Sequence, residues 1–382
     1  MMKTAGAIFA VMASCLLPCV AHADAVQEWR SCIDGARSQD RAVLPGVIAA
    51  CSNRIAAGAD TPASLTRAYV ARATAYLTLE DTARGMADFD QAMKLSPEDE
   101  RLFYLVGQIQ RMQGHYDGAL ARLDHALALR PSYTDALLER GFTHVLRKEY
   151  DLGLADLDHA ELLQPDNWRV HQNIGYAWLE QGQCDKAVAS LAHALALQPD
   201  NGEAFYLVGL CKMKTGATQE AALNLEQAAS LSSDTRVFAM LGRAHADLGQ
   251  YDKAIDDYTA GLKVDAANAS LLNDRCWTRA EWGQQLHEAL ADCDQALKVQ
   301  PGSPNLLDSR GFVRFRMGDY AAAVADLDAS LKLRPNAAPS LYVRGLARHR
   351  LGDAHGGDAD IAAAMAAKPT VGEFYARFGI AP

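Results

Sequence analysis

The sequence lacks the features typical of nucleic-acid-binding proteins and metalloproteins. Its 382 residues carry 47 acidic and only 37 basic side chains, which gives a formal net charge of -10. Such an acidic chain disfavours nucleic acid and anionic membrane surfaces as partners, because both are negatively charged. The cysteines and histidines form no CxxC motif and no Cys-His cluster, which argues against zinc binding and thioredoxin-like chemistry. We therefore expect neither a metal nor a cofactor.

Catalytic motifs are also missing from the sequence. It has no glycine-rich phosphate loop, no nucleophile elbow and no HExxH motif. Paired aspartates such as Asp326 and Asp328 recur, but residues two apart on a helix point about 200° apart and cannot converge on one substrate atom. We expect these pairs to lie on a solvated outer surface, and we expect a protein that is not an enzyme.

The long apolar run of the chain is confined to its start. Residues 5–20 are apolar apart from small polar interruptions and one proline, and an Ala-His-Ala sequence ending at Ala23 follows. This pattern predicts a signal peptide over residues 1–23 that is cleaved after Ala23, and hence a periplasmic or secreted protein. A lipid anchor at Cys15 or Cys19 is the alternative. The run is too short for a membrane span, so we expect no integral membrane segment after cleavage.

What the sequence does contain is a repeat, seen clearly in the stretch 168–199. Its apolar residues follow two amphipathic helical stripes, and Gly182 supplies the left-handed residue that ends the first helix. Small residues, Gly175 in the first helix and Ala187 in the second, allow the two helix axes to approach closely. The stretch therefore predicts a helical hairpin that ends at Pro199.

The same spacing returns every 34 residues between residues 66 and 369, where nine units fit. Each unit has a small residue in its first helix: Ala73, Gly107, Gly141, Gly175, Gly209, Gly242, Cys276, Gly311 and Gly345. One residue is missing between Ser233 and Gly242, and one is added between Gly283 and Ala289. The register recovers by Pro301, so we expect the stack to continue through an altered joint.

This pattern resembles the tetratricopeptide repeat (TPR) family, whose 34-residue unit ends in a proline. The resemblance implies an all-α fold, a right-handed α-solenoid of antiparallel helix pairs whose first helices line a concave groove. We expect an N-terminal capping helical hairpin over residues 24–65, nine tandem TPR units over 66–369, and a C-terminal capping helix over 370–382.

Six cysteines remain after the predicted leader, an even number that favours disulfides in an exported protein. The favoured pair is Cys32 with Cys51, one on each helix of the first hairpin. Cys276 and Cys293 replace the usual small and large residues of a single repeat, so either a disulfide or two buried thiols is expected there. Pairing of Cys184 with Cys211 is the weaker candidate.

The predicted groove is the candidate functional site. The first helices carry a second set of aromatic residues, which by the resemblance face the groove: Tyr104, Phe142, Tyr176, Tyr206, Trp277, Phe312, Phe315 and Tyr342. Charged contacts are expected from Arg101, Arg111, Arg169, Lys214, Arg243, Arg316 and Arg350. Such rings either anchor a bound segment or seal the joints between repeats.

The sequence thus predicts a non-enzymatic adaptor or scaffold of the cell envelope that binds a protein or peptide segment in its groove. The alternative is a stoichiometric structural component of an envelope assembly or secretion complex.

Overall fold

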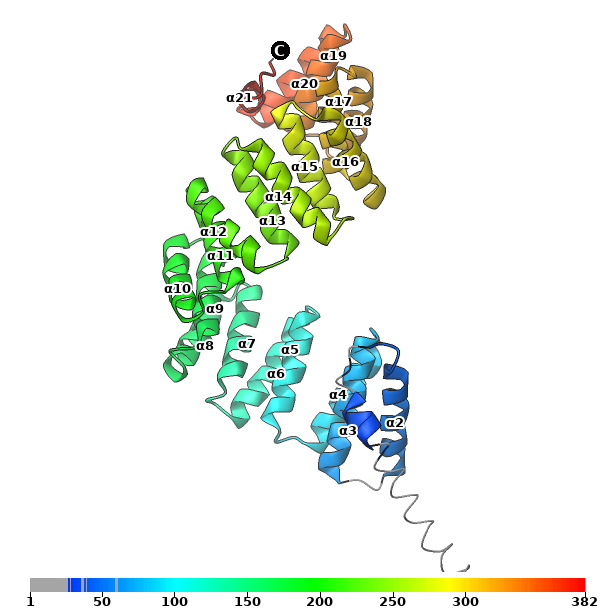
Figure 1. Cartoon of the computed structure of the whole chain (residues 1–382), viewed down its shortest axis with the longest axis vertical. Helices are drawn as coiled ribbons and strands as arrows, with labels where there is room; N and C mark the ends of the chain where they lie inside the picture. Colours follow the sequence, from blue (N-terminus) through cyan, green and yellow to red (C-terminus); the bar gives the residue numbers. More distant parts are fainter. Residues whose placement is uncertain (1–26, 28, 36–37, 39, 59–60, 382) are drawn as a thin grey trace, which may run out of the picture. The chain divides into compact units, whose positions relative to one another are not determined.

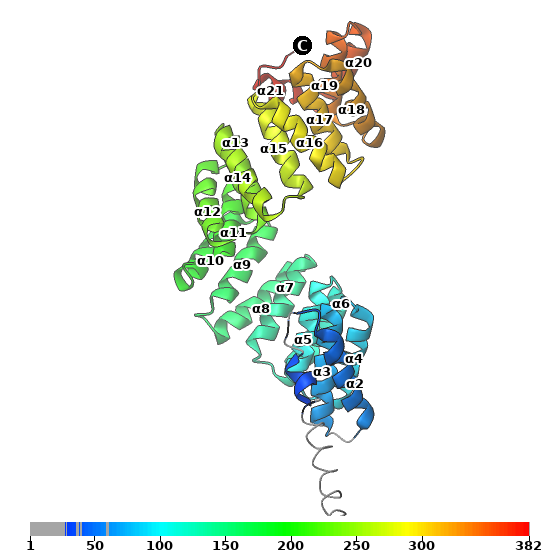
Figure 2. The same ribbon diagram turned by 45° about the vertical axis from the view of Figure 1, so that its right-hand side comes forward.

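A computed structural model describes residues 27, 29–35, 38, 40–58 and 61–381 of the chain. The predicted signal peptide and its cleavage site lie outside these residues. Within the described ranges the regular structure is helical and contains no strand. The helices form consecutive antiparallel pairs, and they divide into two compact units that meet in sequence at Pro165 and Asp166 (Figures 1 and 2).

Unit 1 extends to Pro165 and contains three complete hairpins behind a short N-terminal segment. Its helices are α2 (Leu44–Ala57), α3 (Pro62–Thr78), α4 (Thr82–Leu95), α5 (Glu100–Met112), α6 (Tyr116–Leu129), α7 (Thr134–Leu146) and α8 (Tyr150–Leu163). Helix α3 therefore begins ahead of Thr66, where the regular repeat register starts. Residues 29–33 are also helical, and Cys32 lies in a core with Leu44, Val47 and Ala68.

Unit 2 contains six hairpins and a final short helix. Its helices are α9 (Trp168–Glu180), α10 (Cys184–Leu197), α11 (Gly202–Lys214), α12 (Thr218–Leu231), α13 (Thr235–Asp247), α14 (Tyr251–Val264), α15 (Ala269–Trp282), α16 (Leu286–Val299), α17 (Pro304–Met317), α18 (Tyr320–Leu333), α19 (Ala338–Arg350), α20 (Ala354–Ala367) and α21 (Val371–Ala376). Each first helix packs against its own second helix and against the next hairpin. The predicted all-α stack of antiparallel helix pairs is confirmed in each unit.

Close approach within a hairpin explains the recurrent small residues. In the α9–α10 hairpin, a Cβ atom on Gly175 would lie 2.6 Å from Cγ of Leu191 and 3.2 Å from the carbonyl oxygen of Ala187. Leu191 is fully buried in this contact. A larger residue at Gly175 would force the helices apart, because cores at this density have no spare volume.

Side-chain caps and left-handed turns set the helix ends. The side chains of Asp99, Asn201 and Asn268 accept backbone hydrogen bonds at the starts of α5, α11 and α15. In the joint with one added residue, both Gly283 (φ 76°) and Gln285 (φ 53°) are left-handed. The insertion is therefore absorbed in the turn, and α16 keeps its contact with α15.

The aspartate pairs are where the structure differs most from expectation. Only one member of each pair is solvated; the other, represented by Asp88, Asp156, Asp292 and Asp326, is buried. The prediction of an outer, solvated surface was therefore wrong for half of these residues. It overlooked that an arginine on the facing first helix can pair with a buried carboxylate.

Candidate functional site

Three of the predicted groove residues of unit 1 lie at the joint between α5 and α7. Tyr104 of α5 packs against Tyr133, with 5.2 Å between ring centroids. Arg111 lies over the ring of Phe142, 5.1 Å from its centroid, and forms an ion pair with Glu139 of α7. These residues contribute to the joint between α5 and α7, and their binding of a partner stays a prediction.

An apolar pocket opens elsewhere in unit 1, between α3 and α5. It encloses about 530 Å³ and is lined by Ile33, Val70, Leu102 and Leu105, among others. Exposed Arg101, one of the predicted charged contacts, lies at this pocket.

In the first part of unit 2, the predicted rings lie partly within the core. Tyr206 is buried and Arg236 covers its ring, whereas Tyr176 is half-buried against the same core. Lys214 donates a hydrogen bond of 3.4 Å to the carbonyl oxygen of Leu179. Arg169 is exposed at the start of α9.

In the last part of unit 2, the predicted aromatic residues form one cluster. Trp277 of α15 lies 4.9 Å from Phe312 of α17 between ring centroids. Phe312, Phe315 and Tyr342 are buried, with 1%, 9% and 2% of their surfaces exposed. Arg350, at the end of α19, is exposed. We call the surface formed by α13, α15, α17 and α19 the first-helix face.

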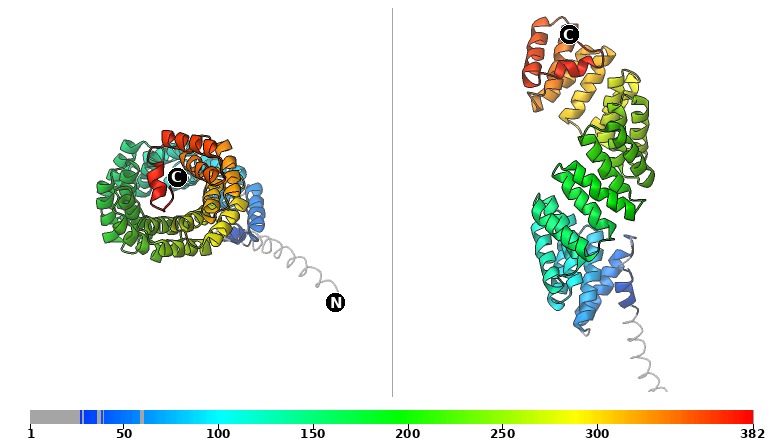
Figure 3. Two further views of the ribbon diagram at one scale, coloured as in Figure 1. Left: turned by 90° about the horizontal axis from the view of Figure 1, so that it is seen from above. Right: turned by 90° about the vertical axis from the view of Figure 1, so that its left-hand side faces the viewer.

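The C-terminal segment covers part of this face. Tyr375 of α21 stacks on Tyr342 with 5.3 Å between centroids, and it meets Phe312 edge-on at 5.4 Å. Arg316 of α17, a predicted groove residue, donates a 3.0 Å hydrogen bond to the carbonyl oxygen of Phe378. Burial lowers the pKa of Arg316. Helix α21 thus contacts α19 and α20 as a cap would, and it lies beside them in both views of Figure 3. Its Tyr375 also reaches Phe312 of α17.

A pocket of about 630 Å³ remains beside the C-terminal segment, bounded by α13, α15 and α21. Arg243, Asp247, Trp277 and Glu281 line it from the repeats. Arg243 and Asp247 form an exposed ion pair of 3.0 Å, and the Trp277 indole donates a 2.6 Å hydrogen bond to Glu281. Burial raises the pKa of the Glu281 carboxyl group.

A smaller pocket of about 190 Å³ adjoins it and contains Asp274 and Tyr258. Burial raises the pKa of Asp274 to about 6 and that of Tyr258 well above its usual range. Asp274 was not singled out from the sequence, since its burial depends on how α13 and α15 pack together. The two pockets combine aromatic rings, carboxylates and the Arg243 guanidinium group.

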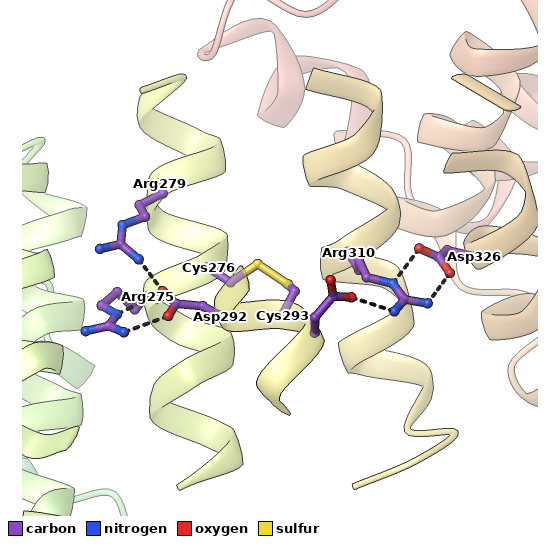
Figure 4. Close-up of a disulfide and its surroundings, with 8 residues drawn as sticks. Arg275, Cys276, Arg279, Asp292, Cys293, Arg310 and Asp326 are labelled. Carbon is purple, nitrogen blue, oxygen red and sulfur yellow. Dashed lines mark hydrogen bonds and ion pairs between the residues drawn. A yellow bond between two sulfur atoms is a disulfide. The ribbon is translucent and has the colours of Figure 1, made fainter. Parts of the chain in front are cut away.

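The structure contains two of the three disulfides considered. Cys32 is bonded to Cys51 with 4.9 Å between Cα atoms, and Cys276 is bonded to Cys293 with 5.7 Å (Figure 4). Cys184 and Cys211 contact each other as buried free thiols, so the structure differs from the weaker pairing prediction. The bond between α15 and α16 lies beneath the first-helix face and fixes the hairpin that carries Trp277.

Arginines next to the small residues form a ladder that the sequence reading missed. Arg310 of α17 binds both oxygens of Asp326 on α18, at 2.8 and 2.7 Å, and also Asp294 on the preceding α16, at 2.8 Å (Figure 4). Arg72, Arg140, Arg275 and Arg344 make equivalent contacts to their own second helix and to the one before it. The ladder is structural, because each arginine is used in joining three helices.

Other kinds of site receive no support from the described residues. Nowhere in these ranges do three or more histidine, cysteine or acidic side chains gather in a way that suits a metal ion. Among the helices that the structure describes, each is too short or too polar to cross a bilayer.

Comparison with solved structures gives similar folds. A tetratricopeptide repeat protein from Parabacteroides merdae aligns with a TM-score of 0.51 and 18% identity, covering 65% of this chain and 99% of that one. Pseudomonas aeruginosa pilF gives a TM-score of 0.48 and 20% identity, covering 54% of this chain and 94% of its own. PilW, a type IV pilus biogenesis factor, gives 0.48 and 17%, with coverage of 55% and 97%. No curated protein matches the chain.

Sequence models of the tetratricopeptide repeat match residues 70–134, 173–234, 235–268, 278–339 and 311–368. These ranges together span more than half of the chain, and they lie within the region of paired helices. The 34-residue spacing, the paired helices and the family matches agree, and the chain therefore belongs to the tetratricopeptide repeat family.

Proposed function

We propose that this TPR protein is a non-enzymatic adaptor that binds a segment of a protein partner on the first-helix face of unit 2. One observation carries the proposal: the chain's own C-terminal segment already lies on this face, held by ring contacts and by the hydrogen bond from Arg316 to the carbonyl oxygen of Phe378. The face therefore has the shape and the donors that a bound helix requires.

The chemistry beside that segment supports further binding. Trp277 is only half-buried and lies at the pocket together with Arg243 and Glu281. Tryptophan and arginine are the residue types that most often dominate binding energy at interfaces. We infer that Trp277 is the main anchor and that the charged residues around it orient the partner.

We further propose that the adaptor works in the cell envelope after cleavage of its leader. The support is the apolar run before Ala23 and the even number of cysteines after it. The acidic net charge supports a protein partner over nucleic acid.

Site-specific photo-crosslinking in cells tests the site. A photoreactive residue in place of Arg243 is expected to capture one defined envelope protein, and Trp277→Ala in the same chain is expected to reduce that product at least tenfold. A tenfold loss corresponds to about 1.4 kcal/mol, a modest value for removal of an interface tryptophan.

The matched control is the same photoreactive residue in place of Leu223, which is exposed on the second helix α12. Capture of the same protein with equal yield from Leu223, or a product that Trp277→Ala does not reduce, would contradict binding on the first-helix face.

The alternative role, a stoichiometric part of an envelope complex, is favoured by a different surface. The last residues of five second helices in unit 2 are exposed aliphatic side chains: Leu197, Leu231, Val264, Val299 and Leu333. A periodic apolar row of this kind can contact a neighbouring subunit. If that role is correct, the protein will elute from native envelope extracts only as a large complex, and Leu333→Lys will release it.

A further inference from the structure

The C-terminal segment, residues 371–381, reaches further than a terminal cap needs to. A cap covers the exposed side of the last hairpin, here α19 and α20. This segment also places Tyr375 against Phe312 of α17, and it places Phe374 and Phe378 at the pocket formed with α13 and α15. Figures 1 and 2 both show α21 beside α15. It therefore lies along the face on which a ligand of the repeats would bind.

Side chains of the repeats, more than the segment's own helix, hold it in place. Helix α21 has only six residues, too few for a stable isolated helix in water. Val371, Tyr375 and Ile380 are buried in the core of unit 2. The segment thus folds by docking, as a short peptide does when it binds to a groove.

The recognition uses aromatic rings together with one cation. Arg377 lies over the rings of both Phe374 and Phe378, at 5.0 and 5.5 Å from their centroids. It lines the same pocket as Asp247 and Glu281, and its charge acts on Glu281. Glu281 therefore complements the positive charge that the segment presents, whereas Asp247 is already paired with Arg243.

One part of the fit is incomplete. The Tyr375 hydroxyl group is buried and has no hydrogen-bond partner among the described residues. The Asp308 carboxylate lies near enough to act on it electrostatically, and this carboxylate accepts a hydrogen bond from Ser340. A buried hydroxyl without a partner weakens docking, because it loses its hydrogen bonds to water.

We propose that the C-terminal segment is an intramolecular ligand that occupies the partner site, and that the partner displaces it with a short helix of the same chemistry. That helix carries aromatic residues one turn apart and an arginine or lysine between them, as in Phe374, Arg377 and Phe378. The proposal rests on the function proposed above, since it assigns the binding site and the partner class of the same face.

Competition with a synthetic peptide of residues 369–382 tests the proposal on the full-length protein. The labelled peptide is expected to bind the double variant Tyr375→Ala/Phe378→Ala at least tenfold more tightly than the wild type, because the variant's own segment no longer fills the site. Tyr375→Phe removes the unpaired hydroxyl group and keeps the ring, so this variant is expected to bind the peptide more weakly than the wild type.

Matched changes test the chemistry of recognition. Adding Glu281→Gln to the opened double variant is expected to weaken peptide binding about threefold or more. We expect the same loss when alanine replaces the peptide's arginine that corresponds to Arg377. Asp252→Asn, an exposed change on α14, is the control and should leave binding unchanged.

Equal peptide affinity for the wild type and for an opened variant with native helicity would overturn the proposal. If the double variant loses helicity, the single variant Phe378→Ala replaces it in the binding experiment. If crosslinking captures no envelope protein while the peptide experiment succeeds, only the envelope partner is refuted. If a partner is captured but the peptide does not displace it, the shared site is refuted and the proposed adaptor function is not.

Discussion

Among single residues, Asp274 is a carboxyl group whose surroundings shift its ionisation strongly. It lies in the small pocket between α13 and α15, where burial raises the pKa of its carboxyl group to about 6. An acid with a raised pKa in the folded state binds its proton more tightly when folded than when unfolded. Its contribution to stability is therefore fully present below about pH 4 and is lost as the pH rises through about 6.

We predict that Asp274→Asn stabilises the protein at pH 7, by an amount on the order of 2–3 kcal/mol. The gain should shrink as the pH falls from 6 to 4, because the wild-type carboxyl group is then protonated in both states. Urea unfolding of both proteins between pH 4 and 7.5 measures this difference. A constant difference across that range, or one equal to that of the exposed control Asp252→Asn, would contradict it.

The sequence predicted individual site residues only through the periodicity of the helices that contain them. The stripe that contains Trp277, Phe312 and Tyr342 follows from their spacing on first helices. The contact of Tyr375 with Phe312 and Tyr342 does not follow, because nothing local in residues 371–381 indicates which helices the segment will cover. Which first-helix rings bind a partner stays a prediction.

Among secondary-structure elements, the arginine ladder determines how strongly neighbouring hairpins hold together. Arg310 has two carboxylate partners of different exposure: Asp326 is 6% exposed at its side chain, whereas Asp294 is 43% exposed. Removing one partner of a buried ion pair leaves the other charge buried and unpaired, but an exposed pair contributes little.

We therefore predict that Asp326→Asn destabilises the protein by about 3 kcal/mol, because Arg310 and Arg314 both lose this carboxylate. Asp294→Asn, the matched change on the same arginine, is expected to cost less than about 1 kcal/mol. Denaturant unfolding measured by circular dichroism compares the two. Similar losses of unfolding free energy for both variants would show that the stability contributed by these ion pairs does not depend on their burial.

The elements themselves were well specified by the sequence. Small residues at fixed spacing, such as Gly175 and Ala187, set the approach of two helices, and a left-handed glycine such as Gly182 sets the turn. The ladder was missed although it has a signal: an arginine directly precedes the small residue in five units, as at Arg310 and Gly311. The aspartates were considered alone, so their facing partners were not recognised.

For the molecule as a whole, cysteine chemistry links the fold to the proposed compartment. After the predicted leader the chain has six cysteines, of which the structure bonds Cys32 to Cys51 and Cys276 to Cys293. The first bond closes a 19-residue separation beside the small N-terminal core, which corresponds to about 3 kcal/mol in the chain-entropy model. The remaining thiols, Cys184 and Cys211, are buried.

We predict two free thiols per chain in the exported protein when it is denatured without reductant, and six after reduction. In the native protein these two thiols should react slowly, because burial raises the pKa of Cys211 to about 12 and keeps its reactive thiolate scarce. Thiol titration of protein purified from the envelope, with and without denaturant, measures both values. Six free thiols without reductant would refute the disulfides. No free thiol would mean that Cys184 and Cys211 pair after export, as their contact in the structure permits.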